Sequence, residues 1–504
     1  MKSKIVLFLT LVILVASCSK DSVIPSPNPN PNPNPDPTAV FNPATDNVII
    51  NHEMRAAWVT TVYGLDWPAG TTGSTAQTSA LINTIEKLKN LNINVIFFQA
   101  MSSCETMYAS SILPWSRYLT GNYGQNPGYD PLAVAVQAAH ERGIEIHAWL
   151  NPLRLGSSTI TYPAGHPALL HPEWYCSYIT KNDKGEDITT RYWNPGLPEV
   201  RQYLQNVVVE ILNKYDVDGI HFDDYFYPDG LQNKPTIWDD TATYQQYKGS
   251  FTDVHKWREN NIDLMVKAVY DAVKATKPKA LFGISPSGQY ANTLALYANP
   301  VTWINSGTID YLAPQIYWQI GHSTADFTTL ANFWNTKSAN NIPIFPGLAA
   351  YRLGESGFPS STEFQNEVNV CRGLSNVKGH CWFRTQHITN TDPTSIFNTL
   401  NQLLKQTLYP GLSLVPKMGT YQYAAPSVPS VTLSSKTITW PDASNATTYA
   451  VYELKRKGTT TSWDAILKYH GANKSYTGET GKNYVVIAVN GREKSLFQKV
   501  LYIQ

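Results

Sequence analysis

Two adjacent carboxylates close an otherwise apolar stretch near the middle of the chain. The stretch runs from Asp218 to Pro228, and Asp223 and Asp224 stand where a buried strand would end. Hydrolysis of a glycosidic bond uses two carboxyl groups, of which one protonates the leaving oxygen and the other attacks or activates water. A strand that ends in two acids among aromatic rings is therefore a candidate active site. A helix cap or an ion pair at a strand end is the alternative interpretation.

Alternation along this strand separates two faces. Because successive side chains of a strand point to opposite sides, His221, Asp223 and Tyr225 share one face. Ile220 and Phe222 share the other face, which suits packing against helices. In β/α-barrel enzymes the catalytic groups lie where strands end and the following loops begin. We therefore expect Tyr225 to contact the substrate beside the acids. His221 is a second-rank candidate for such a contact, because a lone histidine inside a barrel is more often structural.

Polar and aromatic side chains end other predicted strands in the same way. Alternation places Trp149 and Asn151 on one face of the third strand, and Gln315 and Tyr317 on one face of the sixth. Such groups could stack on a sugar or hydrogen-bond to it, and core packing is the alternative for each. The predicted substrate-binding residues are Trp58, Glu105, Trp149, Asn151, Arg154, His221, Tyr225, Gln315, Tyr317 and Trp318.

The positions of the other acidic residues bear on which class of glycosidase the chain could be. Glu105 follows the second predicted strand and is the best candidate for a third carboxylate at the cleft. The seventh strand ends at Gly347–Ala349 without an acid, which argues against barrel glycosidases whose nucleophile is a glutamate at that point. No His-x-His or carboxylate-rich spacing points to a metal site, and no cofactor is expected.

Eight short apolar segments alternate with helical patterns from residue 55 onward. Strand–loop–helix units repeated eight times predict a (β/α)8 barrel over residues 51–410. The expected strands are Arg55–Thr61, Asn94–Ala100, Glu145–Asn151, Gly219–Tyr225, Leu281–Pro286, Tyr311–Tyr317, Ile344–Ala349 and Gly379–Thr385. The clearest expected helices are Ala80–Leu91, Pro131–Arg142, Pro198–Lys214 and Ile262–Thr276. Long loops over 101–130, 152–197 and 226–258 are expected to shape a binding cleft.

The last part of the chain has a different character. Prolines and a glycine near residues 410–426 indicate a linker, and residues 427–504 are rich in β-type segments. Short strands with turns at small intervals predict a β-sandwich. Thr437–Trp440, Thr448–Lys455 and Asn483–Asn490 resemble strands of a fibronectin type III module. We expect a spacer or an auxiliary sugar-contacting domain.

The N-terminus has the features of an export signal. Two lysines precede the apolar run Ile5–Val15, which is too short to span a bilayer and is typical of a secretory signal. The run ends in Val-Ala-Ser-Cys, which matches a bacterial lipoprotein box, so residues 1–18 are expected to be a signal peptide ending at a lipidated Cys18. An ordinary signal peptide is the alternative. Residues 19–50 are expected to be a Pro/Asn-rich linker.

This signal sequence predicts an outer-membrane lipoprotein on the periplasmic face or the cell surface. The protein would be held by its lipid rather than span the bilayer. The formal net charge is +1, with 39 basic and 38 acidic residues, which gives no electrostatic case for nucleic acid. The 30 tyrosines and 14 tryptophans suit stacking on sugar rings. The alternative is a Tyr-rich secreted protein in which these rings have no role in sugar binding. We expect a monomer that binds a polysaccharide or an oligosaccharide.

The four cysteines after Cys18 fit no zinc motif. Cys371 falls in an expected helix and Cys381 in the following strand, so a disulfide between them would be close in sequence. Separate buried thiols are the preferred prediction.

Several stretches resemble the glycosyl-hydrolase-like family 10 of bacterial secreted proteins. The matching segments are 54–61, 113–116, 127–132, 139–149, 193–196, 218–228 and 313–318. The resemblance spans residues 53–405 and implies a (β/α)8 fold and glycosidase activity, with peptidoglycan strands stripped of their peptides as the substrate of some members. After the second strand the family tends to carry Arg and then Asp, where this chain has Met101 and Glu105. This departure bears on the substrate class and on activity.

A fainter similarity to family-18 chitinases supports a sugar substrate. Asp218, Gly219, Asp223 and Tyr317 echo the pattern of that family, and Tyr225 takes the place of its glutamate. In those enzymes the N-acetyl group of the substrate is the nucleophile. The similarity is an analogy only.

Together these observations predict a lipid-anchored glycoside hydrolase that cuts an amino-sugar-containing glycan, with peptidoglycan as the candidate. Asp224 is the candidate general acid, and Asp223 would orient the substrate, raise the pKa of its neighbour or act as nucleophile. Three alternatives stay open. They are a non-catalytic glycan-binding surface protein, a scaffold whose terminal β-domain holds a partner, and a hydrolase of a plant or host glycan.

Overall fold

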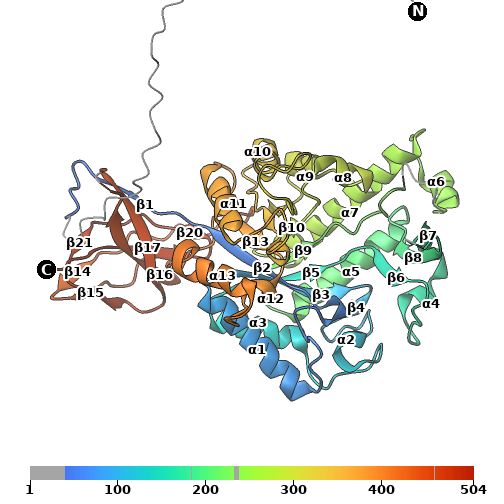
Figure 1. The fold of residues 1–504 in the computed structure, drawn as a ribbon, viewed down its shortest axis with the longest axis horizontal. Helices are drawn as coiled ribbons and strands as arrows, with labels where there is room; N and C mark the ends of the chain where they lie inside the picture. Colours follow the sequence, from blue (N-terminus) through green and yellow to red (C-terminus); the bar gives the residue numbers. More distant parts are fainter. Residues whose placement is uncertain (1–39, 183, 232–237, 459) are drawn as a thin grey trace, which may run out of the picture.

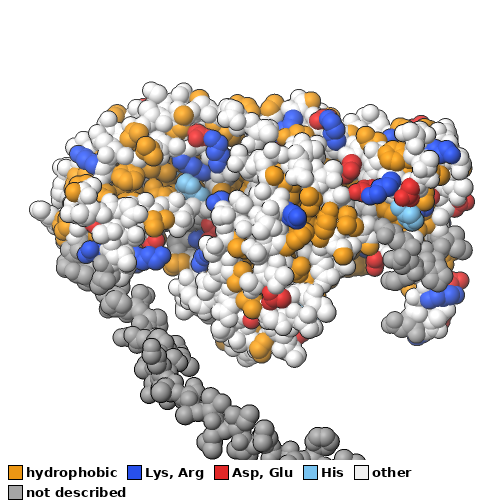
Figure 2. Space-filling model, turned by 90° about the horizontal axis from the view of Figure 1, so that it is seen from above, with side chains coloured by type: hydrophobic (Ala, Val, Ile, Leu, Met, Phe, Trp, Pro, Cys, Tyr) orange, Lys and Arg blue, Asp and Glu red, His pale blue; other side chains and the backbone are white. Residues whose placement is uncertain are grey.

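The computed structural model describes residues 40–182, 184–231, 238–458 and 460–504. The predicted signal peptide, its Cys18 and most of the predicted linker lie outside the described residues. Within the described ranges, no helix is both long enough and apolar enough to cross a membrane. Figure 1 shows a mixed α/β part beside a smaller part made of strands. On the face drawn in Figure 2, acidic and basic side chains are interspersed, in keeping with the near-zero net charge.

Eight parallel strands form the central sheet, in the order β11-β10-β9-β5-β3-β2-β13-β12. Parallel bridges pair Leu312 with Ile344 and Gln315 with Gly347, so the segments of the two outermost strands meet and the sheet curls round on itself. The predicted α/β class is therefore confirmed. The strands are β2 (Met54–Val59), β3 (Val95–Ser102), β5 (Glu145–Leu150), β9 (Gly219–Phe222), β10 (Leu281–Ile284), β11 (Tyr311–Leu312), β12 (Gly347–Leu348) and β13 (Gly379–Trp382).

Helices follow the strands and cover the outside of the sheet (Figure 1). The longer ones are α1 (Ser74–Asn90), α3 (Pro131–Glu141), α5 (Pro198–Lys214), α7 (Val254–Thr276), α10 (Phe327–Lys337), α11 (Thr362–Gly373) and α13 (Ile396–Leu403). As predicted, α3 begins with Pro131 after an Asp130 cap, whose side chain accepts a hydrogen bond from the Ala133 amide at 3.0 Å.

Short elements lie in the connections between these units. They are η1 (Val62–Gly64), β4 (Glu105–Thr106), α2 (Arg117–Thr120), α4 (Pro167–Leu170), η2 (Pro172–Trp174), α6 (Thr241–Tyr247), α8 (Tyr290–Ala295), α9 (Pro300–Ser306), η3 (Ala350–Arg352), α12 (Thr385–Ile388) and η4 (Leu404–Leu408). Several of these elements come directly after strands of the sheet, so they shape the loops at its carboxyl edge.

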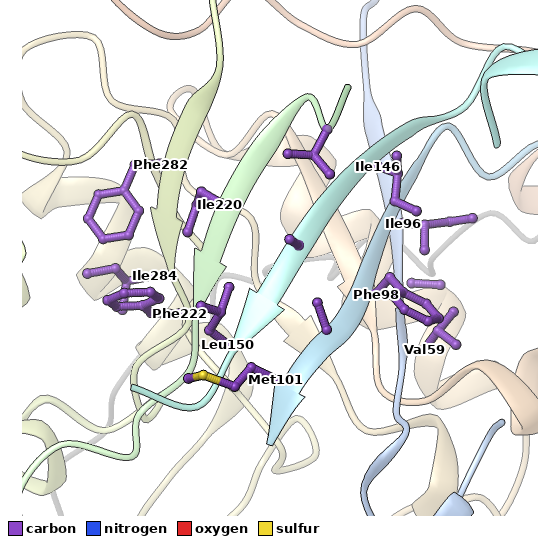
Figure 3. Close-up of a cluster of buried hydrophobic side chains, with 14 of the residues drawn as sticks. Val59, Ile96, Phe98, Met101, Ile146, Leu150, Ile220, Phe222, Phe282 and Ile284 are labelled. Carbon is purple, nitrogen blue, oxygen red and sulfur yellow. The ribbon is translucent and has the colours of Figure 1, made fainter. Parts of the chain in front are cut away.

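Alternate strand residues pack on opposite sides of the sheet. Ile220 and Phe222 belong to the large apolar cluster between sheet and helices, on the face predicted for them (Figure 3). Phe97 and Tyr311 belong to the smaller cluster inside the curled sheet. Gly283 makes room for this inner ring, because a Cβ at that position would lie 2.0 Å from the Tyr311 ring. The inner cluster forms the floor on which the candidate site stands.

The predicted loop over residues 152–197 contains an antiparallel sheet that sequence patterns did not reveal. Its order is β6-β8-β7, from β6 (Arg154–Ser157), β7 (Tyr175–Lys181) and β8 (Asp187–Trp193). Both long strands are half-exposed along most of their length, so they lack the buried apolar run that marks the central strands. The sheet fixes Arg154 at the first position of β6, opposite Tyr192.

The C-terminal part consists of strands, as predicted. The larger sheet has the order β1-β17-β16-β19-β20, with β21 paired to β19, and the smaller sheet has the order β14-β15-β18. Apolar side chains from both sheets, including Ile438 and Val451, form one cluster. The strands are β14 (Thr432–Ser434), β15 (Thr437–Thr439), β16 (Thr448–Arg456), β17 (Ser462–Gly471), β18 (Ser475–Thr477), β19 (Asn483–Asn490), β20 (Glu493–Lys494) and β21 (Leu501–Tyr502).

The prediction of a linker through residue 50 is wrong at its end. Asn47–Ile49 form β1, which pairs in parallel with β17 of the C-terminal part. The Trp463 indole anchors this strand, because its Nε1 donates to Asp46 Oδ2 at 2.8 Å and its ring packs edge-on against Phe41. The apolar run Val48–Ile50 is only three residues long and follows a Pro/Asn-rich segment, so it was not recognised as a strand from the sequence.

The two parts of the molecule meet at the amino ends of the central strands. Arg492 Nη2 lies 2.6 Å from the carboxylate of Glu145, the first residue of β5. Lys494 Nζ donates to the Val415 carbonyl at 2.7 Å. The C-terminal part therefore sits at the end of the sheet opposite the carboxyl edge.

The preferred prediction for the four cysteines is confirmed. Cys104, Cys176, Cys371 and Cys381 are all buried free thiols, so no disulfide joins Cys371 to Cys381. Burial raises the pKa of Cys104 to about 12. The Trp193 indole nitrogen donates to its sulfur at 2.8 Å. These thiols act as apolar core residues.

Candidate active site

A pocket of about 230 Å³ opens at the carboxyl edge of the curled sheet. Asp223 and Asp224, which follow β9, are the acids among its lining residues in the described part of the chain. The predicted site residues that line it are Trp58, Trp149, Asn151, Arg154, Asp223, Asp224, Tyr225, Gln315 and Tyr317. They come from or directly follow β2, β5, β9 and β11, so parallel strands bring together groups that lie far apart in sequence.

Asp223 is buried and firmly held. The residue is only 3% exposed. The Trp149 indole donates a hydrogen bond to Asp223 Oδ2 at 3.0 Å. The Tyr225 amide donates to Oδ1 at 3.3 Å. Burial, followed by the neighbouring Asp224 carboxylate, raises the pKa of Asp223 well above its usual range, and the Trp149 hydrogen bond opposes that rise. Both carboxyl oxygens are thus fixed as acceptors.

Asp224 is less buried than its neighbour. Burial raises the pKa of Asp224, and a hydrogen bond with the Gln315 side chain opposes the rise. Gln315 is itself oriented, because its Nε2 donates to the Ser285 carbonyl at 2.8 Å. Two neighbouring carboxyl groups that both resist ionisation can hold a proton at a pH where ordinary aspartates have lost theirs. Such a pair suits acid–base chemistry.

The predicted contact residue His221 lies beneath the pocket rather than in it. The Trp58 indole donates to His221 Nε2 at 3.2 Å, which leaves the proton on Nδ1, 3.0 Å from the Tyr311 hydroxyl. The Tyr311 hydroxyl can then donate to His147 Nδ1 at 2.8 Å. Burial lowers the pKa of His221 well below its usual range, so the ring is neutral. This residue supports Trp58 and does not reach the substrate.

Arg154 presents unused donors to the pocket. Its guanidinium lies 4.9 Å from the centre of the Tyr225 ring, a cation–π contact. Within the described residues it makes no ion pair or side-chain hydrogen bond, and its Nε is fully buried without a partner. A partly buried cation whose donors face a cleft is available to a ligand oxygen.

Two further predicted residues do not line this pocket, and for Glu105 the prediction is wrong. Glu105 is completely buried outside the pocket, where Arg117 binds its carboxylate through Nη2 at 2.9 Å and through the backbone amide at 2.8 Å. An acid after the second strand therefore caps α2 instead of facing the cleft. Trp318 is half-buried and does not line the pocket either, whereas Tyr317, one residue earlier, does. Adjacent strand-end residues point in different directions.

The structure also shows where the side chain of Met101 lies, at the position where the family tends to carry arginine. Its side chain is 2% exposed and belongs to the apolar cluster between sheet and helices, next to Leu150 and Phe222 in Figure 3. The register of β3 against β5 shifts between Gln99 and Met101, and Gln99 lines the pocket. Met101 therefore contributes no side chain to the pocket wall.

Several pocket residues were missed. Tyr63 and Leu65 come from the turn after β2, Gln99 from β3 and Ser285 from the end of β10. Their common signal is position, since each lies at or just after the carboxyl end of a strand. Phe383, directly after β13, also lines the pocket.

Comparison with known proteins identifies the family of the chain. The family model described as glycosyl hydrolase-like 10 matches residues 53–365. The chain is 34% identical over 415 residues to "Glycosyl hydrolase YngK" of Bacillus subtilis (strain 168), covering 77% of this chain and 78% of that protein. It is 31% identical over 381 residues to "Glycosyl hydrolase DigH" of Escherichia coli (strain K12), covering 66% of this chain and 83% of that protein.

Among solved structures, the glycoside hydrolase domain of PgaB (BpsB) from Bordetella bronchiseptica aligns with a TM-score of 0.47 and 15% identity, over 71% of this chain and 98% of that chain. A likeness at that level carries no functional argument. The family assignment rests on the family model and on the two relatives. The chain belongs to the glycosyl hydrolase-like 10 family, and it is a glycoside hydrolase.

Proposed function

We propose that this enzyme hydrolyses a glycosidic bond of an amino-sugar-containing glycan through Asp223 and Asp224. The observation that carries the proposal is the pair of buried, adjacent carboxyl groups in a pocket walled by tryptophan and tyrosine rings. Aromatic faces suit the apolar side of a sugar ring, and paired carboxyl groups suit acid–base cleavage. The amino-sugar preference, with peptidoglycan strands as the candidate substrate, rests on the family resemblance.

In this proposal Asp224 protonates the leaving oxygen, because it is the less buried acid and can meet the substrate. Asp223 acts as the carboxylate that attacks, activates water or orients the reacting sugar. Trp149 and the Tyr225 amide hold it in one position through the two hydrogen bonds described above. Arg154 donates to sugar hydroxyl or acetamido oxygens, since it lines the pocket and makes no ion pair within the described residues.

We also propose the finer assignments of the chain. The curled sheet is a (β/α)8 barrel, and the C-terminal strands are a fibronectin type III-like sandwich. The mature protein is a lipid-anchored monomer of the outer membrane, held through Cys18, on the strength of the lipoprotein box. Replacing Cys18 with Ser should move the protein from the membrane fraction to the soluble fraction, and unchanged membrane association would contradict the anchor.

Replacing Trp149 with Phe is expected to lower kcat/KM by about 10-fold or more, since a hydrogen bond to a charged group contributes about 1.5–3 kcal/mol. The Trp149 donor lowers the pKa of Asp223, so its loss raises that pKa. Activity that needs ionised Asp223 disappears as pH falls through this pKa. The acidic limb of the pH profile should therefore move to higher pH in the variant. A pH–rate series on both proteins checks this, and an unmoved limb would exclude Asp223 as the group that must ionise.

The direct test of the function is product analysis by mass spectrometry. A soluble form starting at residue 38 would be incubated with peptide-free peptidoglycan strands, chitin oligosaccharides, and plant and host glycans. We expect shortened amino-sugar fragments that disappear in the Asp223→Asn and Asp224→Asn variants. Cleavage of another glycan class would retain the site and discard the amino-sugar assignment. Binding without cleavage of any glycan would refute the proposed hydrolysis.

A further inference from the structure

Tyr63 is the most exposed aromatic side chain among the described residues, and it lines the active-site pocket. Its residue is 68% exposed, compared with 37% for Tyr225 in the same pocket. A single exposed ring is ordinary on a protein surface, but this ring lies in the wall of the pocket that holds the two carboxyl groups. Its one ring contact is with Tyr118, edge to face at 5.8 Å, so most of its surface stays open.

The backbone under this ring is held in place from the pocket floor. Thr61 N and Val62 N both donate to Gln99 Oε1, at 2.9 and 2.8 Å. The Thr61 hydroxyl donates to the Gln99 carbonyl at 2.9 Å. Gln99 Nε2 in turn donates to Asn151 Oδ1 at 2.8 Å. The turn that presents Tyr63 is therefore tied to two pocket residues from neighbouring strands, which pre-organises the ring for a ligand.

The same turn places Tyr63 in an unfavourable backbone conformation. Its φ is 57° and its ψ is 14°, in the left-handed region that residues with a Cβ rarely adopt. Glycine would adopt it without cost, and Gly64 next to it has a φ of 62°. Neither burial nor backbone preference explains a tyrosine here. Strain retained at a cleft and combined with exposure indicates a binding role.

We propose that Tyr63 stacks on a sugar ring of the bound glycan, at a subsite beside the two carboxyl groups. The inference rests on the proposed function and deepens it. The ligand is a pyranose with one apolar C–H face, attached to the sugar whose bond is cut. The preferred substrate is then an oligosaccharide long enough to reach Tyr63, rather than a short glycoside.

Kinetics on a graded series of oligosaccharides tests this subsite. The series would be built from the glycan that product analysis identifies. We expect Tyr63→Ala to raise KM by about 10-fold for chains that reach the subsite and to leave kcat within about twofold, which corresponds to about 1.4 kcal/mol of binding. The shortest substrates should be cut equally by both proteins. Tyr63→Phe and Tyr63→Trp should keep the KM of the wild type, since both keep a ring.

Two matched variants guard against a trivial effect. Tyr421 is an exposed tyrosine outside the pocket, 37% exposed, and Tyr421→Ala should leave KM unchanged. Tyr63→Gly removes the ring and relieves the backbone, so its melting temperature should equal or exceed that of the wild type while its KM rises.

The outcomes separate this inference from the proposed function. If the wild type cuts a glycan and Tyr63→Ala shows the same KM at every length, the subsite is refuted and the hydrolase stands. An equal rise in Tyr421→Ala would also refute stacking. If the wild type cuts nothing, the proposed function fails. Calorimetric binding of chitin oligosaccharides of graded length to the wild type and to Tyr63→Ala then decides the role of Tyr63, and equal affinities at every length would refute the subsite.

Discussion

Replacing Asp224 with Asn should lower kcat by about 10²–10⁴-fold, the usual contribution of general acid catalysis. An amide of the same shape cannot deliver a proton to the leaving oxygen. Binding should persist, because the aromatic walls and Arg154 remain. Turnover and calorimetric affinity, measured on the same glycan, check the two halves of this expectation.

The variant has a second measurable consequence. The Asp224 carboxylate helps to raise the pKa of Asp223, so its removal should lower that pKa. Carbon NMR titration of labelled aspartate carboxyl groups reports the direction. Asp187→Asn is the matched control, because Asp187 is an exposed aspartate on β8 that pairs with Lys181 at the surface. Undiminished kcat in Asp224→Asn, or an equal loss in Asp187→Asn, would remove Asp224 from the mechanism.

Replacing Arg492 with Met should lower the free energy of unfolding by about 3 kcal/mol, the lower end of the cost of breaking a buried ion pair. Its partner Glu145 would remain with its carboxylate 23% exposed and without the guanidinium. Lys417→Met is the matched control, because the Lys417–Glu493 pair of the same region has an exposed cation, with side chains 60% and 25% exposed, and should contribute no more than about 1 kcal/mol. Urea unfolding of each variant measures the difference.

The same pair gives a pH dependence of known sign. Burial opposes ionisation of Glu145, but Arg492 and His147 outweigh it and lower the pKa to about 2. A carboxylate with a depressed folded-state pKa contributes stability above its ordinary value of 4.5, and this contribution disappears as pH falls toward 2. The wild type should thus lose more stability than Arg492→Met over this range. Parallel losses would mean that Arg492 does not set the pKa of Glu145.

The sequence carried most information where strands are buried on both faces. Unbroken apolar runs located all eight central strands, and alternation separated Ile220 and Phe222 from Asp223. The ends of the strands were less predictable. The predicted strands run past the observed ends of β9 and β11. After β9 the chain continues into the pocket wall at Asp223, and after β11 the pairing is reduced to isolated bridges such as Gln315 with Gly347.

The failures share a physical reason. The rule that strand-end residues face the cleft selects Glu105, His221 and Trp318. Each of them either has other partners nearby or does not line the pocket. Glu105 meets Arg117 twelve residues later, and His221 lies one layer below the acids among Trp58 and Tyr311. Tyr63 was missed because its importance depends on backbone conformation and exposure, which a single sequence does not encode in any local pattern.

The position of β1 has a consequence for how the enzyme would meet its substrate. The chain enters the described structure beside β17, in the part that sits against the amino ends of the central strands, whereas the pocket opens at their carboxyl ends. A tether that starts at Cys18 would therefore be attached to the side of the molecule opposite the pocket. The mouth of the enzyme would point outward from the lipid surface, toward polymer that lies beyond the membrane rather than toward lipid-linked precursors within it.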